Sequence, residues 1–246
     1  MKYVVMTLFP EMIRQGLNVS IIGRAMEKGI IQLETRDIRE FARNRYGAVD
    51  DYPFGGGAGM VMQAEPIYAC YENLKKDLKT KAPVVLMSPS GTPFTQKKAR
   101  ELAQHEEIVF LCGHYEGIDQ RIIDEIVTEE ISIGDYVLTG GELPALVVMD
   151  AVSRMIPGVL GNDSSAQEES FSGMFLEYPQ YSRPRVFREK EAPSVLLSGN
   201  HEAIRIWRLK EAIRKTMKVR PDLIQVDAMS KEEKKLYEEL LRERKE

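Results

Sequence analysis

The chain has 246 residues, of which 43% are hydrophobic and 29% charged, and these values exclude a disordered, collagen-like or low-complexity protein. No apolar run is long enough to span a bilayer, and the net charge of -4 argues against a broad nucleic-acid-binding surface. Two cysteines are too few for a disulfide framework, and because the first residues do not form a signal peptide, we predict a cytoplasmic protein.

Residues 1–160 alternate apolar runs of strand length with helical segments. The predicted strands are Tyr3–Leu8, Ile31–Asp37, Pro83–Ser88, Ile108–Cys112 and Val127–Ile131. The predicted helices are Pro10–Leu17, Ile21–Lys28 with Ser20 as its N-cap, Glu65–Lys79, Thr95–Gln104 with Thr95 as its N-cap, Asp119–Glu125 and Pro144–Ile156. Because strand, loop and helix repeat in this order, we predict an α/β domain with a mostly parallel sheet over residues 1–160.

The pattern changes after Pro157. Residues 161–174 are small and polar, which predicts a flexible linker. Asn200 is the predicted N-cap of a long helix, and Ser230–Glu246 forms a second, charged helix, so we predict a small helical domain over residues 175–246. Residues 161–220 hold 11 Lys and Arg against 8 Asp and Glu, and this local positive charge permits contact with phosphates.

Three glycine-containing loops follow buried strands of the predicted sheet: Ser88–Gly91, Gly113–Gly117 and Ile133–Gly141. In open α/β sheets, ligands bind at the carboxyl ends of the strands, and glycine lets backbone groups approach a ligand closely. Together the loops predict one small-molecule site, although each alone is also explained as a tight turn. Dinucleotide-binding and Walker motifs are absent, and the loops carry carboxylates and hydroxyls with almost no cation, which suits an adenosine-like ligand that bears positive charge.

Several long motifs resemble the bacterial tRNA (guanine-N(1)-)-methyltransferase family. They are VDDYPFGGGAGMVM, LCGHYEGIDQR, ISIGDYVLTGGELPA, SRMIPGVLG followed by EESF, and LLSGNH with IWRLK, in order over roughly residues 1–220. The resemblance implies a SPOUT-type α/β fold with a deep trefoil knot, acting as a homodimer. It also implies transfer of a methyl group from S-adenosylmethionine to nitrogen 1 of guanine at tRNA position 37.

The resemblance assigns most of the three loops to the methyl donor, with backbone groups recognising the adenine. The implied donor-binding residues are Leu86, Ser88, Pro89, Gly91, Gly113, Tyr115, Ile133, Gly134, Asp135, Tyr136, Val137, Leu138, Gly140, Gly141 and Pro144.

The resemblance further implies three catalytic residues. Glu116 is expected near the sulfonium or the guanine, and Arg154 is expected to stabilise negative charge on the guanine. Without the resemblance, Arg154 is explained as an i,i+4 ion pair with Asp150, and Glu116 as a solvated carboxylate. Glu169 occupies the position of the family's usual Asp, the general base, with one extra methylene, and its neighbour Glu168 is the alternative base.

A tRNA partner is consistent with the basic residues of the second domain, for which an ordinary solvated surface is the alternative. These residues are Arg183, Arg185, Arg188, Arg205, Arg208, Lys210, Arg214, Lys215 and Lys218. We predict no metal ligands, and a role for magnesium is not assignable from the sequence. The alternative functions are a related methyltransferase for another RNA position and a non-catalytic RNA-binding protein.

Overall fold

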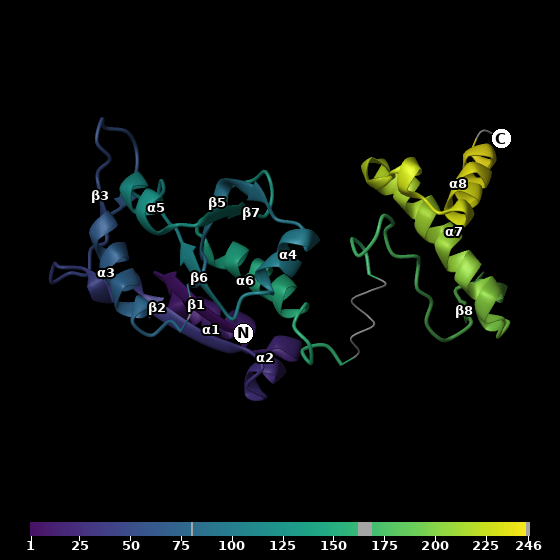
Figure 1. Ribbon diagram of the computed structural model, residues 1–246, viewed down its shortest axis with the longest axis horizontal. Helices are drawn as coiled ribbons and strands as arrows, with labels where there is room; N and C mark the ends of the chain where they lie inside the picture. Colours follow the sequence, from purple (N-terminus) through teal and green to yellow (C-terminus); the bar gives the residue numbers. More distant parts are fainter. Residues whose placement is uncertain (80, 162–168, 245–246) are drawn as a thin grey trace. The chain divides into compact units, whose positions relative to one another are not determined.

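The computed structural model of the protein describes residues 1–79, 81–161 and 169–244 (Figure 1). The chain divides into two units, Met1–Asp163 and Ser164–Glu246. Half of the predicted linker, including Glu168, lies outside the described residues.

A five-stranded sheet forms the centre of the first unit, and its neighbouring strands are all parallel. The strand order is β2-β1-β6-β5-β7, so β5 separates β6 from β7. The bounds are β1 (Lys2–Thr7), β2 (Gln32–Asp37), β5 (Val84–Pro93), β6 (Glu107–Cys112) and β7 (Glu129–Ser132), with a separate antiparallel pair, β3 (Asp50–Asp51) and β4 (Val61–Met62). The predicted α/β class with a mostly parallel sheet is confirmed.

Helices cover both faces of this sheet (Figure 1). Alternate residues of β1 enter different apolar clusters: Tyr3 and Val5 pack with α1, α2, α4 and α6, whereas Val4 and Met6 pack with α3, α5 and η1. This alternation is the two-residue period of a strand that is buried on both faces. The bounds are α1 (Pro10–Leu17), α2 (Ser20–Glu27), η1 (Ile38–Phe41), α3 (Ala64–Lys75), α4 (Gln96–Leu102), α5 (Gln120–Ile126) and α6 (Glu142–Ser153).

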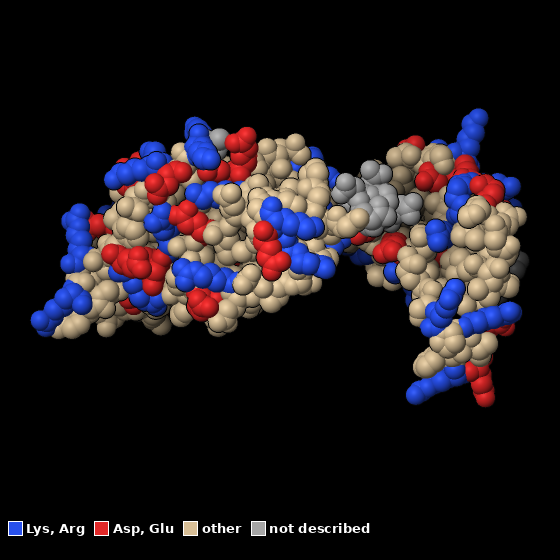
Figure 2. All heavy atoms as spheres, turned by 90° about the horizontal axis from the view of Figure 1, so that it is seen from below, with Lys and Arg blue, Asp and Glu red and all other residues tan. Residues whose placement is uncertain are grey.

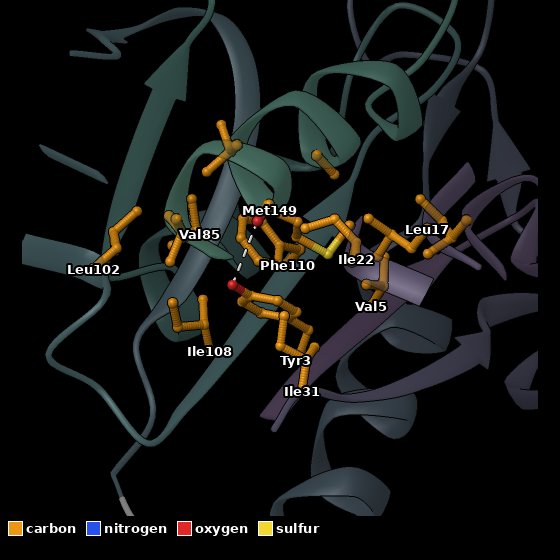
Figure 3. Close-up of a cluster of buried hydrophobic side chains, with 14 of the residues drawn as sticks. Tyr3, Val5, Leu17, Ile22, Ile31, Val85, Leu102, Ile108, Phe110 and Met149 are labelled. Carbon is orange, nitrogen blue, oxygen red and sulfur yellow. Dashed lines mark hydrogen bonds between the residues drawn. The ribbon is translucent and has the colours of Figure 1, made fainter. Parts of the chain in front are cut away.

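Tyr3 links β1 to α6 inside the first cluster (Figure 3). Its hydroxyl lies 3.4 Å from the carbonyl oxygen of Met149, to which it donates, and 3.0 Å from Oγ of Ser153. Its ring packs at a tilt to Phe110 of β6, with the ring centroids 6.0 Å apart. The buried hydroxyl is therefore satisfied without opening the core to water.

Several details of the first unit differ from the sequence-based expectation. Helix α3 ends at Lys75 and not at Lys79. Ser20 is not the N-cap of α2: Val19 precedes the helix, and Ser20 is its first residue with a positive φ of 56°. Strand β5 also continues beyond Ser88, because an irregularity between Met87 and Thr92 lets both residues pair with Ile131. Thr95 is confirmed as the N-cap of α4, accepting a hydrogen bond from the backbone of Lys98.

The second unit is built on two helices, α7 (His201–Val219) and α8 (Lys231–Glu243). Asn200 caps α7, as predicted, and Ser230 forms a capping box with Glu233 at the start of α8. Ile213 of α7 and two leucines of α8, Leu236 and Leu240, form its buried cluster. The remaining elements are β8 (Val186–Phe187), β9 (Lys190–Glu191), η3 (Ser194–Leu197), η4 (Pro221–Leu223) and η5 (Val226–Ala228).

None of the helices in the described ranges is both long and apolar enough to cross a membrane. The trefoil knot that the resemblance implies stays a prediction.

Alkaline pH is expected to destabilise the first unit through its buried acids. Burial raises the pKa of the Cys70 thiol to about 12 and also raises the pKa values of the Cys112 thiol and the Tyr3 hydroxyl. The unfolded chain then releases protons from about pH 9 while the folded chain retains them, so the free energy of unfolding falls as pH rises from 9 toward 12. Urea unfolding at a series of pH values measures this, with Cys70→Val giving a shallower fall. A free energy that stays constant over this range would contradict the assignment.

Candidate functional site

A cavity of about 450 Å³ opens at the carboxyl ends of β6 and β7 and beside residues 86–90 of β5. Its walls come from the three glycine-containing loops identified in the sequence, because the ends of neighbouring parallel strands meet at one edge of the sheet. The predicted donor-binding residues that line it are Leu86, Ser88, Pro89, Gly113, Tyr115, Ile133, Gly134, Tyr136, Val137, Leu138, Gly140, Gly141 and Pro144.

Two predicted donor-binding residues, Gly91 and Asp135, do not line this cavity. Asp135 is exposed, between two residues that do line it. Gly91 lies where β5 passes close to β7: a Cβ added to it would lie 2.5 Å from the backbone nitrogen of Ile131. The glycine at position 91 is therefore explained by close packing of two backbones.

The sequence did not single out several other lining residues. Most belong to the predicted loops or directly adjoin them. Ile118 and Gln120 lie within the motif LCGHYEGIDQR but were not singled out, and Ile123 of α5 lies beyond that motif. The additional lining residues are Met87, Ser90, His114, Gly117, Ile118, Gln120, Ile123, Glu130, Ile131, Ser132 and Thr139.

The polar groups of the lining are not basic. It includes the carboxylates Glu116 and Glu130, several hydroxyls and His114, and no Lys or Arg side chain is among the described residues that line the cavity. Such a surface favours a neutral or cationic ligand over a polyphosphate.

Glycines determine how closely the walls approach each other. The backbone N–H of Gly141 donates to the carbonyl of Gly113 at 2.9 Å, so the chain that leaves β7 reaches the end of β6. A Cβ on Gly141 would lie 2.7 Å from Cα of Cys112, which this approach does not permit. Gly134, with φ of 151°, lies beneath the ring of Tyr136.

Glu116 is positioned by the glycine-rich segment around residues 55–59. Its backbone N–H donates to the carbonyl of Met60 at 2.9 Å, and Met62 donates in turn to the carbonyl of Gly117. Gly59 has a positive φ of 83°, and a Cβ there would lie 2.4 Å from Cγ of Glu116. The segment thus supports the Glu116 loop.

Comparisons with known proteins point to one family. A sequence model of the family described as tRNA (Guanine-1)-methyltransferase TrmD matches residues 1–226. A tRNA (guanine-N(1)-)-methyltransferase from Alkaliphilus metalliredigens is 54% identical over 98% of each chain, and one from Moorella thermoacetica is 54% identical over 98% of this chain and 97% of the relative. Another, from Lachnoclostridium phytofermentans, is 50% identical over 98% of this chain and 97% of the relative.

The chain belongs to the tRNA (guanine-N(1)-)-methyltransferase family. The match includes the three cavity loops, Arg154 and Glu169.

The three residues expected to be catalytic in this methyltransferase lie in different places. Glu116 lines the cavity, whereas Arg154 does not. Arg154 is a half-buried residue at the end of α6, and its backbone N–H donates to the carbonyl of Asp150. Glu169 belongs to the second unit, is half-buried, and its carbonyl accepts from the backbone of Ser172. The catalytic roles of all three stay predictions.

The described part of the methyltransferase contains no group of three or more His, Cys, Asp or Glu side chains that could hold a metal ion.

We predict that Gly91→Ala destabilises this methyltransferase. The new Cβ would meet the Ile131 backbone, and overpacking of this kind costs about 1–3 kcal/mol in the free energy of unfolding. Urea unfolding measures the loss. Gly173→Ala is the matched control, since no atom lies within 4 Å of a Cβ built there. Equal stability of the two variants would show that β5 and β7 do not pack as described.

Proposed function

We propose that the protein transfers a methyl group from S-adenosylmethionine to nitrogen 1 of guanine at tRNA position 37, giving 1-methylguanosine. The observation that carries the proposal is identity of 50–54% over 98% of the chain to relatives named tRNA (guanine-N(1)-)-methyltransferase. A tRNA substrate also supports a cytoplasmic location.

The cavity fits the proposed methyl donor. Its volume of about 450 Å³ suits a ligand of nucleoside size with an attached chain. Two carboxylates, Glu116 and Glu130, face a ligand that carries a sulfonium cation, and the glycine edges at Gly113 and Gly140 leave backbone groups open to an adenine. When bound, S-adenosylmethionine supplies an electrophilic methyl group.

The protein's own residues then handle the proton of the guanine. Nitrogen 1 of guanine carries a hydrogen that must leave when the methyl group is added, and a carboxylate within reach can accept it. We assign this role to Glu169. We assign to Arg154 the stabilisation of the negative charge that develops on the guanine, and to Glu116 the orientation of donor or guanine at the cavity.

Ion pairs inside the second unit reduce the number of basic side chains that we assign to tRNA contact. Lys210 and Arg214 of α7 contact Glu243 of α8, at 2.7 and 2.9 Å, so both charges are already partly neutralised. On the face drawn in Figure 2, Lys and Arg are interspersed with Asp and Glu over both units. Within residues 169–244, the members of the predicted basic set that make no ion pair are Arg183, Arg188, Arg208, Lys215 and Lys218, and we assign the phosphate contacts to these.

Aromatic side chains accompany this basic set. The guanidinium of Arg208 lies 4.8 Å from the ring centroid of Tyr178, and the rings of Tyr181 and Trp207 lie 6.2 Å apart. Trp207 is half-buried. Unpaired RNA bases stack on surfaces of this kind, which supports tRNA binding by the second unit.

A homodimer is part of the proposal. Helix α6 is apolar around most of its circumference, and two of its side chains, Leu143 and Val147, are 48% and 50% exposed. They are four residues apart and so share one face of the helix. A second copy of the chain would cover this apolar face.

Methyl transfer tests the proposal directly. Purified protein is incubated with labelled S-adenosylmethionine and a tRNA that carries guanine at position 37, or a matched tRNA with adenine there. We expect label only in the first tRNA, recovered after nuclease digestion as 1-methylguanosine. Equal labelling of both would indicate another RNA position, and tRNA binding without any labelling would indicate a non-catalytic RNA-binding protein.

Substitution of Glu169 tests the assigned base. We expect Glu169→Gln to lower turnover by about 10²–10⁴-fold, because an amide cannot accept the proton. Glu169→Asp keeps the carboxylate and should retain activity, and Glu168→Gln is the matched control with a much smaller effect. Single-turnover methyl transfer measures the rates, and calorimetry checks that donor binding survives. The base would be Glu168 if Glu168→Gln abolished transfer while Glu169→Gln did not.

A further inference from the structure

A buried carboxylate lies behind the wall of the cavity. Glu142, the first residue of α6, is only 2% exposed. Its Oε1 accepts a hydrogen bond from the hydroxyl of Thr7 at 2.5 Å, and its Oε2 lies 2.7 Å from Nε2 of His114. A carboxylate oxygen accepts hydrogen bonds, so we assign the hydrogen of this contact to Nε2 of His114. The first turn of a helix also favours negative charge.

The end of β1 holds His114 in two ways. Thr7 holds it through Glu142, and the ring of Phe9 packs against the imidazole with ring centroids 5.0 Å apart. The backbone N–H of Phe9 donates to the hydroxyl of Thr7 at 2.9 Å. These contacts thus form a closed cycle through Thr7, Phe9, His114 and Glu142.

The imidazole of His114 also contacts the opposite wall of the cavity. A Cβ built on Gly140 would lie 2.1 Å from Cε1 of His114, so the ring occupies the space above that glycine. His114 directly follows Gly113 and precedes Tyr115, which has a positive φ of 59°. Gly113, Tyr115 and Gly140 all line the cavity, and His114 lines it with them. One side chain therefore links the loop after β6 to the loop before α6.

We propose that His114 is a positioning residue for the methyl donor: its hydrogen bond to Glu142 holds the two loops at the separation that the donor requires. This inference rests on the proposed function. Loss of the imidazole would leave the buried Glu142 with one hydrogen-bond donor fewer, and a buried charge that has lost a partner is strongly destabilised. Relief of that penalty would move the loops and widen the cavity.

Two substitutions of similar size test whether the hydrogen bond to Glu142 is needed or whether any polar side chain at position 114 is enough. His114→Gln can place an amide N–H near the position of Nε2, within reach of Glu142, whereas the shorter His114→Asn cannot. We expect the Kd for S-adenosylmethionine, measured by calorimetry, to rise by at least tenfold in His114→Asn and His114→Leu but by less than about threefold in His114→Gln. His105→Leu, at an exposed histidine, is the control.

The KM values of the two substrates distinguish a positioning role for His114 from a purely structural one. We expect the KM for S-adenosylmethionine to rise in His114→Asn while the KM for tRNA stays unchanged, because the assigned tRNA contacts lie in the second unit. Thr7→Val removes the hydroxyl that supports Glu142 from the other side and keeps the shape of the side chain. We expect it to raise the Kd for S-adenosylmethionine as well, and it provides a second test if His114→Leu does not fold.

The outcomes distinguish this inference from the proposed function. If the wild-type protein bound no S-adenosylmethionine, the proposed function would fail together with the inference. If the wild type bound it, and His114→Gln and His114→Asn bound it equally well, the inference alone would be wrong. Equal weakening in His114→Gln and His114→Asn would also overturn it, since the imidazole would then act by itself and not through Glu142.

Discussion

The backbone hydrogen bond from Gly141 to Gly113 is the contact on which the site depends. Strand β5 separates β6 from β7, so the chain that leaves β7 must pass the end of β5 to reach β6. Only glycine lets the two backbones approach this closely, because a Cβ built on Gly141 would lie 2.7 Å from Cα of Cys112. The passage places the ends of three strands around one cavity, and it delivers Glu142 to the start of α6.

Rigid packing on both faces of the sheet holds this arrangement in place. Strand β6 is buried along its whole length, and β1 sends alternate side chains into two separate apolar clusters. The segments that line the cavity belong to or follow β5, β6 and β7 of this packed sheet, so their first residues cannot move without disturbing the core. Catalytic geometry at the sub-ångström level requires such a scaffold.

Carboxylates in this protein serve different purposes according to their surroundings. Glu142 is buried and hydrogen-bonded on both oxygens, which suits a structural link. Glu116 lines the cavity against a glycine, where it can face a bound cation. Glu243 of α8 is exposed and pairs with two basic side chains of α7, so it reduces the net positive charge on the surface of the second unit.

Local patterns in the sequence were enough to predict the five parallel strands, the caps at Thr95 and Asn200, and the loops that line the cavity, because period, capping residues and glycine act within a few neighbours. Only the tertiary structure decided which distant groups meet. Gly91 was expected to bind the donor but packs against β7 outside the cavity. The contact between His114 and Glu142 joins residues 28 apart. No local pattern records such a pairing, since it is set by where the folded strands bring their ends.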